Sequence, residues 1–436
     1  MIMQAQLLRK ERDTAGQNGL GLFLLLLIAA APVLMAILPW DFGPDLPPAR
    51  TFLLAYSIPI LVVELAVILF AFRNQFSPFS AIAALPIWAK VGLIVLLLIA
   101  AATTFLVAHI VVQSFLSGLT WMIHLLFAFS VVYLAKRKIL TVNAQTWFVL
   151  SLGVAAYAAM LAIFIWFTPN RDLYRWEGML PGLPFVRHIG PYALTGFLAA
   201  FALAGISLHR SRYWLGVLLG SIGIGLGIWS GTRGALFAII VAMLLAFIAF
   251  PSLRNRQILR WLILTCLGGT SLSLAYIPPA SSFGLFRVIT ASQQTDPGRL
   301  SSGRTALWAA TAQKVAERPW FGYGERQFNY VVLHQQQGLI QPHNVLLQIA
   351  LQWGLVGAAC FFSMVAMLCA AFYRKAIRIG EEAIPAFLIV TAILVYSLYD
   401  AALFYPYPIM MAVFCIAAIL GRPDEDASPL PANHRD

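Results

Sequence analysis

The amino-acid sequence predicts an all-α polytopic membrane protein, and two observations support that prediction. Of the 436 residues, 61% are hydrophobic and only 11% are charged, with a mean hydropathy of +0.82. Soluble domains are about half apolar and about one quarter charged. About twelve apolar runs follow one another, each near the ~20 residues that an α-helix needs to cross a bilayer. We therefore expect about twelve transmembrane helices and one large loop with amphipathic helices.

The predicted spans are residues 20–38, 52–72, 85–107, 109–135, 146–168, 190–208, 213–229, 234–250, 259–277, 344–372, 384–402 and 407–420. The first run is long enough to cross a membrane and further spans follow it, so we interpret it as a helix and not as a cleavable signal. The last run is short and follows Tyr405-Pro406-Tyr407-Pro408. Because proline lacks an amide donor, we expect this last helix to be tilted, broken or only partly inserted.

Basic residues predict the orientation of the helices, because short cytoplasmic loops carry an excess of Lys and Arg. Arg9, Lys10 and Arg12 precede the first helix and place the N-terminus in the cytoplasm. The same side then holds Arg73, Lys136-Arg137-Lys138, Arg210, Arg212, Arg254, Arg256, Arg260, Arg374, Lys375, Arg378, Arg422 and Arg435. Both termini are thus predicted to be cytoplasmic. This asymmetry and anionic lipid headgroups explain the net charge of +12, so no nucleic-acid partner is predicted.

The connections divide the chain into four regions. Residues 1–277 hold the first nine helices, 278–342 form a large outer loop, 343–420 hold the last three helices, and 421–436 form a cytoplasmic tail whose composition predicts disorder. In the loop, Thr305–Glu317 has helical periodicity, and a second helix is predicted near Glu325–Gln337. Two amphipathic helices beside a membrane predict a lid over a cavity. The alternative is a loop that only joins two spans.

One imidazole and three guanidinium groups on the outer side form the predicted site. His343 lies between the loop and the next span, in Pro342-His343-Asn344. An imidazole titrates near neutral pH and can take a proton from a hydroxyl, which predicts a general base. Arg187, Arg233 and Arg304 face the same side, and converging guanidinium forks can hold a phosphate or diphosphate. Taken singly, each arginine has the alternative role of a headgroup contact.

Other polar residues have two interpretations each. His188 follows the first of these arginines and either contacts the phosphate or packs at the interface, and Asn344 either orients the His343 ring or caps the next helix. Glu64 and Asp400 are carboxylates within predicted spans, where an ionisable residue suggests function. A hydrogen bond within the helix bundle, or a place on a lipid-facing seam, is at least equally compatible with both.

No metal or nucleotide cofactor is predicted. The outer carboxylates, Asp41, Asp45, Asp172, Glu177, Asp296, Glu317 and Glu325, are scattered and lack the spacing of metal ligands. There is no Gly-rich phosphate loop with Lys-Ser/Thr, and the glycines of 223–227 fall within a span, where they allow close helix packing. A metal-dependent sugar-nucleotide transferase is therefore disfavoured, and the arginines are left as the predicted phosphate ligands.

Several stretches together resemble a known family. They are Ser230-Gly231-Thr232-Arg233-Gly234, Gly303-Arg304-Thr305-Ala306-Leu307-Trp308, Pro319-Trp320-Phe321-Gly322-Tyr323-Gly324, His343-Asn344-Val345-Leu346-Leu347-Gln348 and Trp353-Gly354-Leu355-Val356-Gly357. With the hydrophobic array, they are similar to the O-antigen ligase family, bacterial inner-membrane enzymes that join a lipid-carried polysaccharide to the lipid A core. The last two stretches are typical of the ligase and polymerase superfamily and separate its two activities poorly.

The resemblance implies a glycosyltransferase of the bacterial inner membrane, embedded in membrane lipids, whose active site faces the periplasm. Its donor would be an undecaprenyl diphosphate-linked glycan and its acceptor a sugar hydroxyl of lipid A-core oligosaccharide. His343 would be the base, and Arg187, Arg233 and Arg304 would hold the diphosphate in place of a metal, with inversion at the anomeric carbon. The alternatives are an O-antigen polymerase, whose acceptor is a second lipid-linked glycan, and a transporter of lipid-linked glycans. Transporters typically have internal repeats and broken midplane helices, and we see no convincing repeat.

Overall fold

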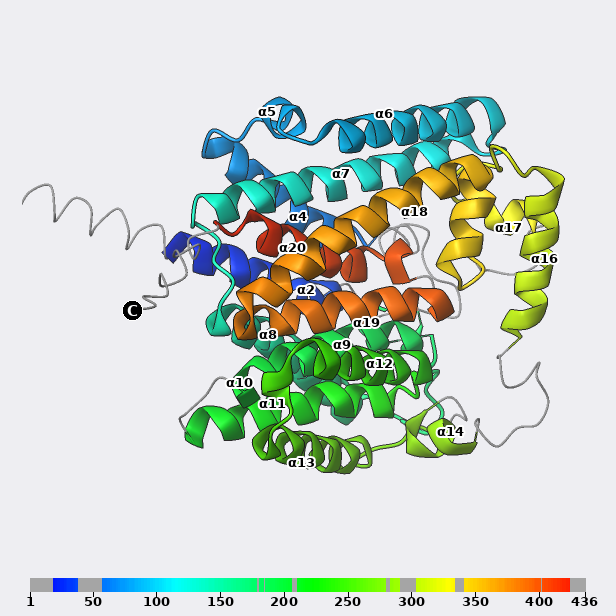
Figure 1. The fold of residues 1–436 in the computed structure, drawn as a ribbon. Coiled ribbons are helices and arrows are strands. Elements are labelled where there is room, and N and C mark those ends of the chain that lie inside the picture. The colour runs from blue at the N-terminus through cyan, green and yellow to red at the C-terminus, as the bar shows by residue number, and fades with distance from the viewer. Residues whose placement is uncertain are drawn as a thin grey trace, which may run out of the picture.

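The computed structural model of the protein describes residues 19–37, 57–178, 180–183, 185–205, 210–279, 283–290, 303–333, 341–400 and 402–423. In these segments the chain forms a helical bundle (Figure 1). Its α-helices are α2 (Ala31–Ala36), α4 (Ile58–Arg73), α5 (Pro78–Ala83), α6 (Ile87–Ala102), α7 (Val111–Lys136), α8 (Ala144–Phe167), α9 (Ile189–Ala200), α10 (Ala202–Gly205), α11 (Arg210–Trp229), α12 (Arg233–Ala249), α13 (Arg256–Ser273), α14 (Gly284–Thr290), α16 (Arg304–Glu317), α17 (Phe328–Val331), α18 (Val345–Ile379), α19 (Ile384–Asp400) and α20 (Pro406–Gly421).

Within the residues that the structure describes, every predicted span is mainly helical, because long apolar runs with few breakers satisfy their backbone groups internally. Among the described residues, six helices are long and apolar enough to cross a membrane: Ile87–Val107, Val111–Lys136, Ala144–Phe167, Arg210–Trp229, Val345–Ile379 and Glu381–Asp400. Shorter apolar helices occupy Gly19–Ala29, Arg233–Ala249 and Pro406–Gly421. The chain is thus a multi-pass membrane protein, and the count of twelve crossings stays a prediction.

Most helices run in nearly the same direction, with α6 at one edge of the bundle and α13 at the other (Figure 1). Helix α11 packs closely on both α9 and α13. A Cβ atom on Gly223 would lie 2.4 Å from the Phe197 amide nitrogen, and one on Gly225 would lie 3.0 Å from the Gly269 carbonyl oxygen. The glycines of 223–227 therefore allow close helix approach, as the sequence indicated.

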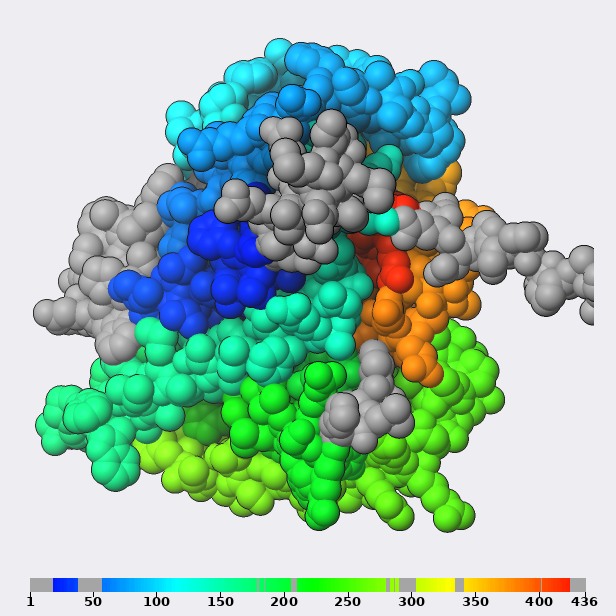
Figure 2. Space-filling view, turned by 90° about the vertical axis from the view of Figure 1, so that its left-hand side faces the viewer, coloured from blue at the N-terminus to red at the C-terminus, as the bar shows by residue number. Residues whose placement is uncertain are grey.

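Helix α20 lies inside the bundle, in contact with α4, α7, α9, α18 and α19. Nearly all of its 16 residues are buried. Seen from the end of the bundle, its red residues lie between teal and orange segments (Figure 2). The short apolar run predicted a tilted, broken or partly inserted helix. The helix is unbroken, because Pro406 and Pro408 occupy its first turn, where no amide donor is needed.

Helix α18 bends sharply at Gly354, whose φ of 66° and ψ of −174° are not helical. The bend frees carbonyl groups, and the Pro319–Gly324 segment takes them up: the amides of Tyr323 and Gly324 donate to Leu351 and Gln352 at 2.9 Å each. A Cβ atom on Gly354 would lie 2.2 Å from the Trp320 carbonyl oxygen. Two of the stretches that carry the family resemblance thus form one packed unit.

The large loop contributes α14, α16 and α17, which gather with the start of α18 at one end of the bundle (Figure 1). Helix α16 spans Arg304–Glu317 and confirms the first predicted loop helix. The second prediction, Glu325–Gln337, is wrong at its start. Among residues 325–333 only Phe328–Val331 is helical, and the positive φ angles of Gly324 and Arg326, 87° and 54°, keep the helix from beginning earlier. Residues 334–337 lie outside the described segments.

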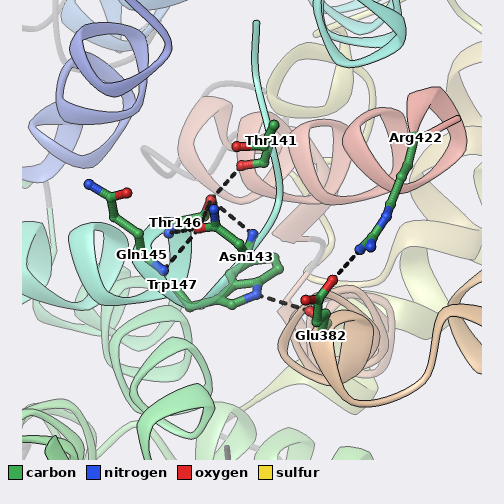
Figure 3. Close-up of polar contacts among 7 residues, drawn as sticks. All are labelled: Thr141, Asn143, Gln145, Thr146, Trp147, Glu382 and Arg422. Atoms are coloured by element: carbon green, nitrogen blue, oxygen red, sulfur yellow. Dashed lines mark hydrogen bonds and ion pairs between the residues drawn. The ribbon is translucent and has the colours of Figure 1, made fainter. Parts of the chain in front are cut away.

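The opposite end of the bundle is held by a different set of polar contacts (Figure 3). Asn143 caps α8 by accepting hydrogen bonds from the amides of Gln145 at 3.0 Å and Thr146 at 3.2 Å. The indole of Trp147 donates to the Glu382 carbonyl at 3.2 Å. The Glu382 carboxylate in turn pairs with Arg422, just after α20, at 2.5 Å. These contacts tie together the ends of α8, α19 and α20.

Candidate active site

His343 lies where the chain enters α18, and its backbone is unusual there. The φ angle of 56° falls in the left-handed region that non-glycine residues rarely adopt. Asn344 is the N-cap: its Oδ1 accepts from the amides of Leu346 at 2.9 Å and Leu347 at 3.1 Å. Its Nδ2 donates to the Leu398 carbonyl on α19 at 3.2 Å. Of the two roles considered for Asn344, the structure shows the cap, which fixes where the His343 side chain begins.

The His343 ring meets a buried carboxylate on the last residue of α19. Nδ1 of His343 lies 2.6 Å from Oδ1 of Asp400. Tyr396, one turn earlier on α19, donates its hydroxyl hydrogen to Oδ2 of Asp400 at 2.6 Å. The Asp400 side chain is 6% exposed, whereas that of His343 is 22% exposed. One edge of the imidazole is therefore held inside the protein, and the ring keeps access to its surroundings.

This geometry selects the tautomer of His343. A carboxylate accepts hydrogen bonds, so the proton between the two groups is carried by Nδ1 of the neutral imidazole. Nε2 then bears the lone pair. Such a ring can take a proton from a hydroxyl at Nε2, while Asp400 holds it in place and stabilises the imidazolium that forms.

Arg304 brings the loop helix α16 to the same carboxylate. It is the first residue of α16, and its Nη2 lies 3.6 Å from Oδ1 of Asp400. One turn further along, the Trp308 indole donates to the Pro342 carbonyl at 2.9 Å. These two contacts place α16 beside the pair formed by His343 and Asp400.

The other two predicted arginines belong to the same electrostatic environment. Arg187 lies in the short 3₁₀ helix η2 (Val186–His188) just before α9, and Arg233 is the first residue of α12. Burial lowers the pKa of the Arg187 guanidinium; the charges of Arg304 and Arg233 also lower it, and Asp400 opposes them. The structure thus brings the three guanidinium groups into one electrostatic environment with Asp400.

A fourth arginine, Arg287 on α14, joins this group. Burial lowers its pKa, as do the charges of Arg187 and Arg233, with Glu177 opposing. Four guanidinium groups in one environment offer many fixed hydrogen-bond donors and positive charges, which suits an anion that carries more than one charge. We refer to Arg187, Arg233, Arg287 and Arg304 as the arginine cluster.

His188 differs from the cluster in its charge. Burial lowers its pKa to about 4, and its ring centre lies 4.5 Å from that of Tyr405. At neutral pH the ring is therefore uncharged and packs against an aromatic side chain. It could meet a phosphate only through a neutral N–H donor.

The second intramembrane carboxylate, Glu64, has another role. Its two oxygens lie 2.9 and 2.8 Å from Nδ1 of His124, and both side chains are buried. The pair joins α4 to α7. Of the interpretations that the sequence left open for Glu64, the hydrogen bond within the bundle is the one observed.

Sequence reasoning left Asp400 undecided and gave Tyr396 and Arg287 no role. A signal for Asp400 was present, because it ends an apolar span on the level of His343 and has a tyrosine four residues earlier on the same helix face. Arg287 had no such signal, since its helix was not predicted.

The fold and this site define a multi-pass helical membrane protein with a histidine–carboxylate pair beside an arginine cluster at one end of the bundle. Residues 217–362 match the protein-family model described as O-Antigen ligase. This match, over about one third of the chain, supports membership of the O-antigen ligase family and, with it, a glycosyltransferase-like membrane enzyme. The matched segment includes Arg233, Arg304 and His343, whereas Arg187 and Asp400 lie outside it. No curated protein matches the chain.

Proposed function

We propose that this protein is an O-antigen ligase that transfers a polysaccharide from undecaprenyl diphosphate to a sugar hydroxyl of lipid A-core. The main support is the 2.6 Å contact between His343 Nδ1 and Asp400, beside the arginine cluster. A base for a hydroxyl and a binding site for a diphosphate are the two elements that glycosyl transfer from a lipid diphosphate needs. The family match supports this class of enzyme.

In the proposed reaction, Nε2 of His343 removes the proton from the acceptor hydroxyl as its oxygen attacks the anomeric carbon. The new bond joins that oxygen to the anomeric carbon, and the bond from the carbon to the diphosphate oxygen breaks. The diphosphate leaves with the electron pair, and the proton stays on His343 until it passes to the released diphosphate or to solvent. Attack opposite the leaving group inverts the anomeric configuration.

The arginine cluster holds the leaving group. Negative charge grows on the bridging diphosphate oxygen as the bond breaks, and fixed guanidinium groups stabilise that charge. Arg304 reaches both regions, since it lies 3.6 Å from Asp400 and belongs to the cluster. This arrangement supplies the positive charge that a metal provides in other transferases, so the proposed reaction uses neither a metal ion nor ATP.

The proposed topology places this end of the bundle in the periplasm and both termini in the cytoplasm. The basic residues at the ends of α4, α7 and α18 support it, because Arg73, Lys136 and Arg378 all lie in last turns. A C-terminal alkaline phosphatase fusion, which is active only outside the cytoplasm, should then be inactive. An active fusion would show that the true orientation is the reverse of the proposed one.

The function is tested with purified protein in lipid nanodiscs, lipid-linked donor and lipid A-core, in buffer with a chelator and without ATP. We expect glycan joined to lipid A-core by the unaltered protein, and a rate at least about 10²-fold lower for His343→Ala. Undiminished transfer by His343→Ala would show that His343 is not the base.

A reaction with donor alone distinguishes ligase from polymerase. Lengthened lipid-linked glycan, formed without lipid A-core, would identify a polymerase. In lipid vesicles that contain the protein, movement of intact donor across the bilayer without any new glycosidic bond would identify a transporter.

A further inference from the structure

A polar cavity lies beside His343, on the side of α18 that faces α7 and α20. It is lined by Ser117, Thr120, Trp121, His124, Arg326, Gln341, Gln348, Gln352, Leu403, Phe404, Pro406 and Ile409. Its walls continue directly from the site: Gln341 precedes His343 by two residues, and Leu403 follows Asp400 by three. We call it the glutamine cavity.

The glutamines give the cavity unusual chemistry for a membrane-embedded position. Gln348 and Gln352 are 2% and 1% exposed, on successive turns of α18 below the Asn344 cap. In each, Oε1 is buried and has no hydrogen-bond partner among the residues that the structure describes. An unpaired buried amide oxygen is costly, so we expect a hydrogen-bond donor that enters the cavity to satisfy these two atoms.

An aromatic surface borders the amides. The Trp121 ring lies 5.8 Å from Phe404, nearly edge-on, and both line the cavity. Amide groups can donate to and accept from hydroxyls, and aromatic faces contact the C–H groups of a pyranose ring. The lining therefore offers both hydrogen-bonding groups and apolar surface to a small ligand.

The size of the cavity limits what fits. Its free volume is about 40 Å³, where one water needs ~10–15 Å³. A whole sugar ring is too large, whereas one substituent, such as a hydroxymethyl or an acetamido group, has a suitable size.

The position relative to the arginine cluster indicates which substrate is bound. Three arginines of the cluster come from η2, α12 and α14, whereas α7, α18 and α20 line the cavity, and α19 with Asp400 lies between α12 and α18 (Figure 1). The fourth, Arg304, lies on α16, which contacts α18. In an inverting displacement the acceptor approaches from the side opposite the leaving diphosphate. The glutamine cavity therefore lies where the acceptor is expected.

We propose that the glutamine cavity is an acceptor subsite that takes one neutral polar substituent of the acceptor sugar, bound to Gln348 and Gln352 and packed on Trp121. This inference rests on the proposed glycosyl transfer. With this substituent bound, a second hydroxyl of the same sugar ring faces His343. The cavity is thus a determinant of which acceptor sugar is used.

The test compares steady-state kinetics of Gln348→Met and Gln352→Met with those of Gln145→Met, an exposed glutamine at the other end of the bundle. Methionine keeps the side-chain length and removes the amide. We expect the KM for lipid A-core to rise about tenfold in each cavity variant, with the KM for donor and kcat within about twofold, and no change in Gln145→Met. An unchanged acceptor KM, or a rise in donor KM alone, would overturn the subsite, although the transferase function would stand.

A second measurement works with the unaltered protein, in case a variant does not fold. Acceptor analogues that each lack one hydroxyl or acetamido group should include one, other than the attacked hydroxyl, with an acceptor KM about tenfold higher. In Gln348→Met that same deletion should have little further effect, since the contact is already lost. Equal KM values across the analogues would exclude the subsite, and absence of transfer with every acceptor would reject the ligase function itself.

Discussion

The two ends of the span Glu381–Asp400, which contains α19, carry similar charged pairs in opposite environments. At one end Asp400, 6% exposed, contacts His343 at 2.6 Å and Arg304 at 3.6 Å. At the other end Glu382, 47% exposed, pairs with Arg422 at 2.5 Å. The shorter contact between a carboxylate and an arginine belongs to the exposed pair. Distance alone therefore does not identify a site, whereas burial and the number of convergent partners do.

The physical difference between the two ends is desolvation. An exposed ion pair contributes about 0–1 kcal/mol, because water and salt screen it. A buried carboxylate gives up hydration and has to be compensated by several partners, as Asp400 is by His343, Tyr396 and Arg304. Such arrangements cluster at functional sites. Substitutions at the Asp400 end should therefore lower the rate of transfer, whereas substitutions at the Glu382 end should leave it nearly unchanged.

Asp400→Asn should have the largest effect on turnover. The amide can donate a hydrogen to Nδ1 of His343, which favours the tautomer with the proton on Nε2 and removes the base. We expect kcat to fall about 10²–10⁴-fold, measured as transfer to lipid A-core by purified protein. Glu382→Gln, at the other end of this span, is the matched control and should keep kcat within about twofold. Similar losses in both variants would mean that Asp400 acts only on the fold.

Arg304→Ala should have the next largest effect, a fall in kcat of about 10²–10³-fold. It removes a charge that stabilises the leaving diphosphate and also a partner of Asp400. Arg422→Ala, which removes an arginine from the exposed pair, is its control. The lost contact is with the diphosphate, which donors with long and short lipid chains share. A donor with a shorter lipid chain should therefore not restore the rate of Arg304→Ala. Full activity in Arg304→Ala would show that Arg304 does not stabilise the leaving diphosphate.

Glu325 extends the comparison to a carboxylate that is buried without a histidine. Burial raises its pKa from 4.5 to about 7. Its ionised form is therefore disfavoured in the folded protein, so stability is lost as the pH rises from about 4.5 through 7. At 1.36 kcal/mol per pH unit the loss is at most roughly 3 kcal/mol above pH 7. Glu325→Gln should remove most of this dependence, measured as thermal unfolding midpoints at pH 5.5 and 8.5. The same fall in the variant would assign it to another group.

Arg422→Ala should have the smallest effect. We expect it to lower the free energy of unfolding by less than about 1 kcal/mol, and the difference from the unaltered protein should vanish at high salt. Thermal unfolding in low and high salt measures this. A loss of several kcal/mol that persists in salt would show that the exposed pair is more than a surface contact.

The sequence predicted the helices well because burial in lipid depends on local composition. Apolar length located the long helices of the bundle, with shifted boundaries: the predicted span 344–372 continues in α18 to Ile379, since Arg374 and Lys375 do not interrupt an α-helix beyond the apolar run. The short helices α5 and α14 were not predicted. Backbone geometry was less accessible. The bend at Gly354 and the turn at Arg326 depend on φ angles that hydropathy does not report.

For the site, residue types predicted the chemistry but not which side chains are in contact. His343 and the arginines were chosen because their side chains suit a hydroxyl and a diphosphate, and the choice used only residue type and side of the membrane. The partner of His343 is 57 residues further along the chain, and the cavity is built from α7, α18 and α20. Contacts of this range follow from how helices pack, which a single sequence does not state.

The central position of α20 has a consequence for the order of assembly. Every helix that α20 contacts, from α4 to α19, is synthesised before it. Its 16 residues give a length of about 24 Å, shorter than the ~30 Å of hydrocarbon that a free span would need to cross. The space between the helices that surround α20 must therefore stay open until α20 has been translated. The bundle, and with it the Asp400 end of α19, closes only after α20 has been inserted.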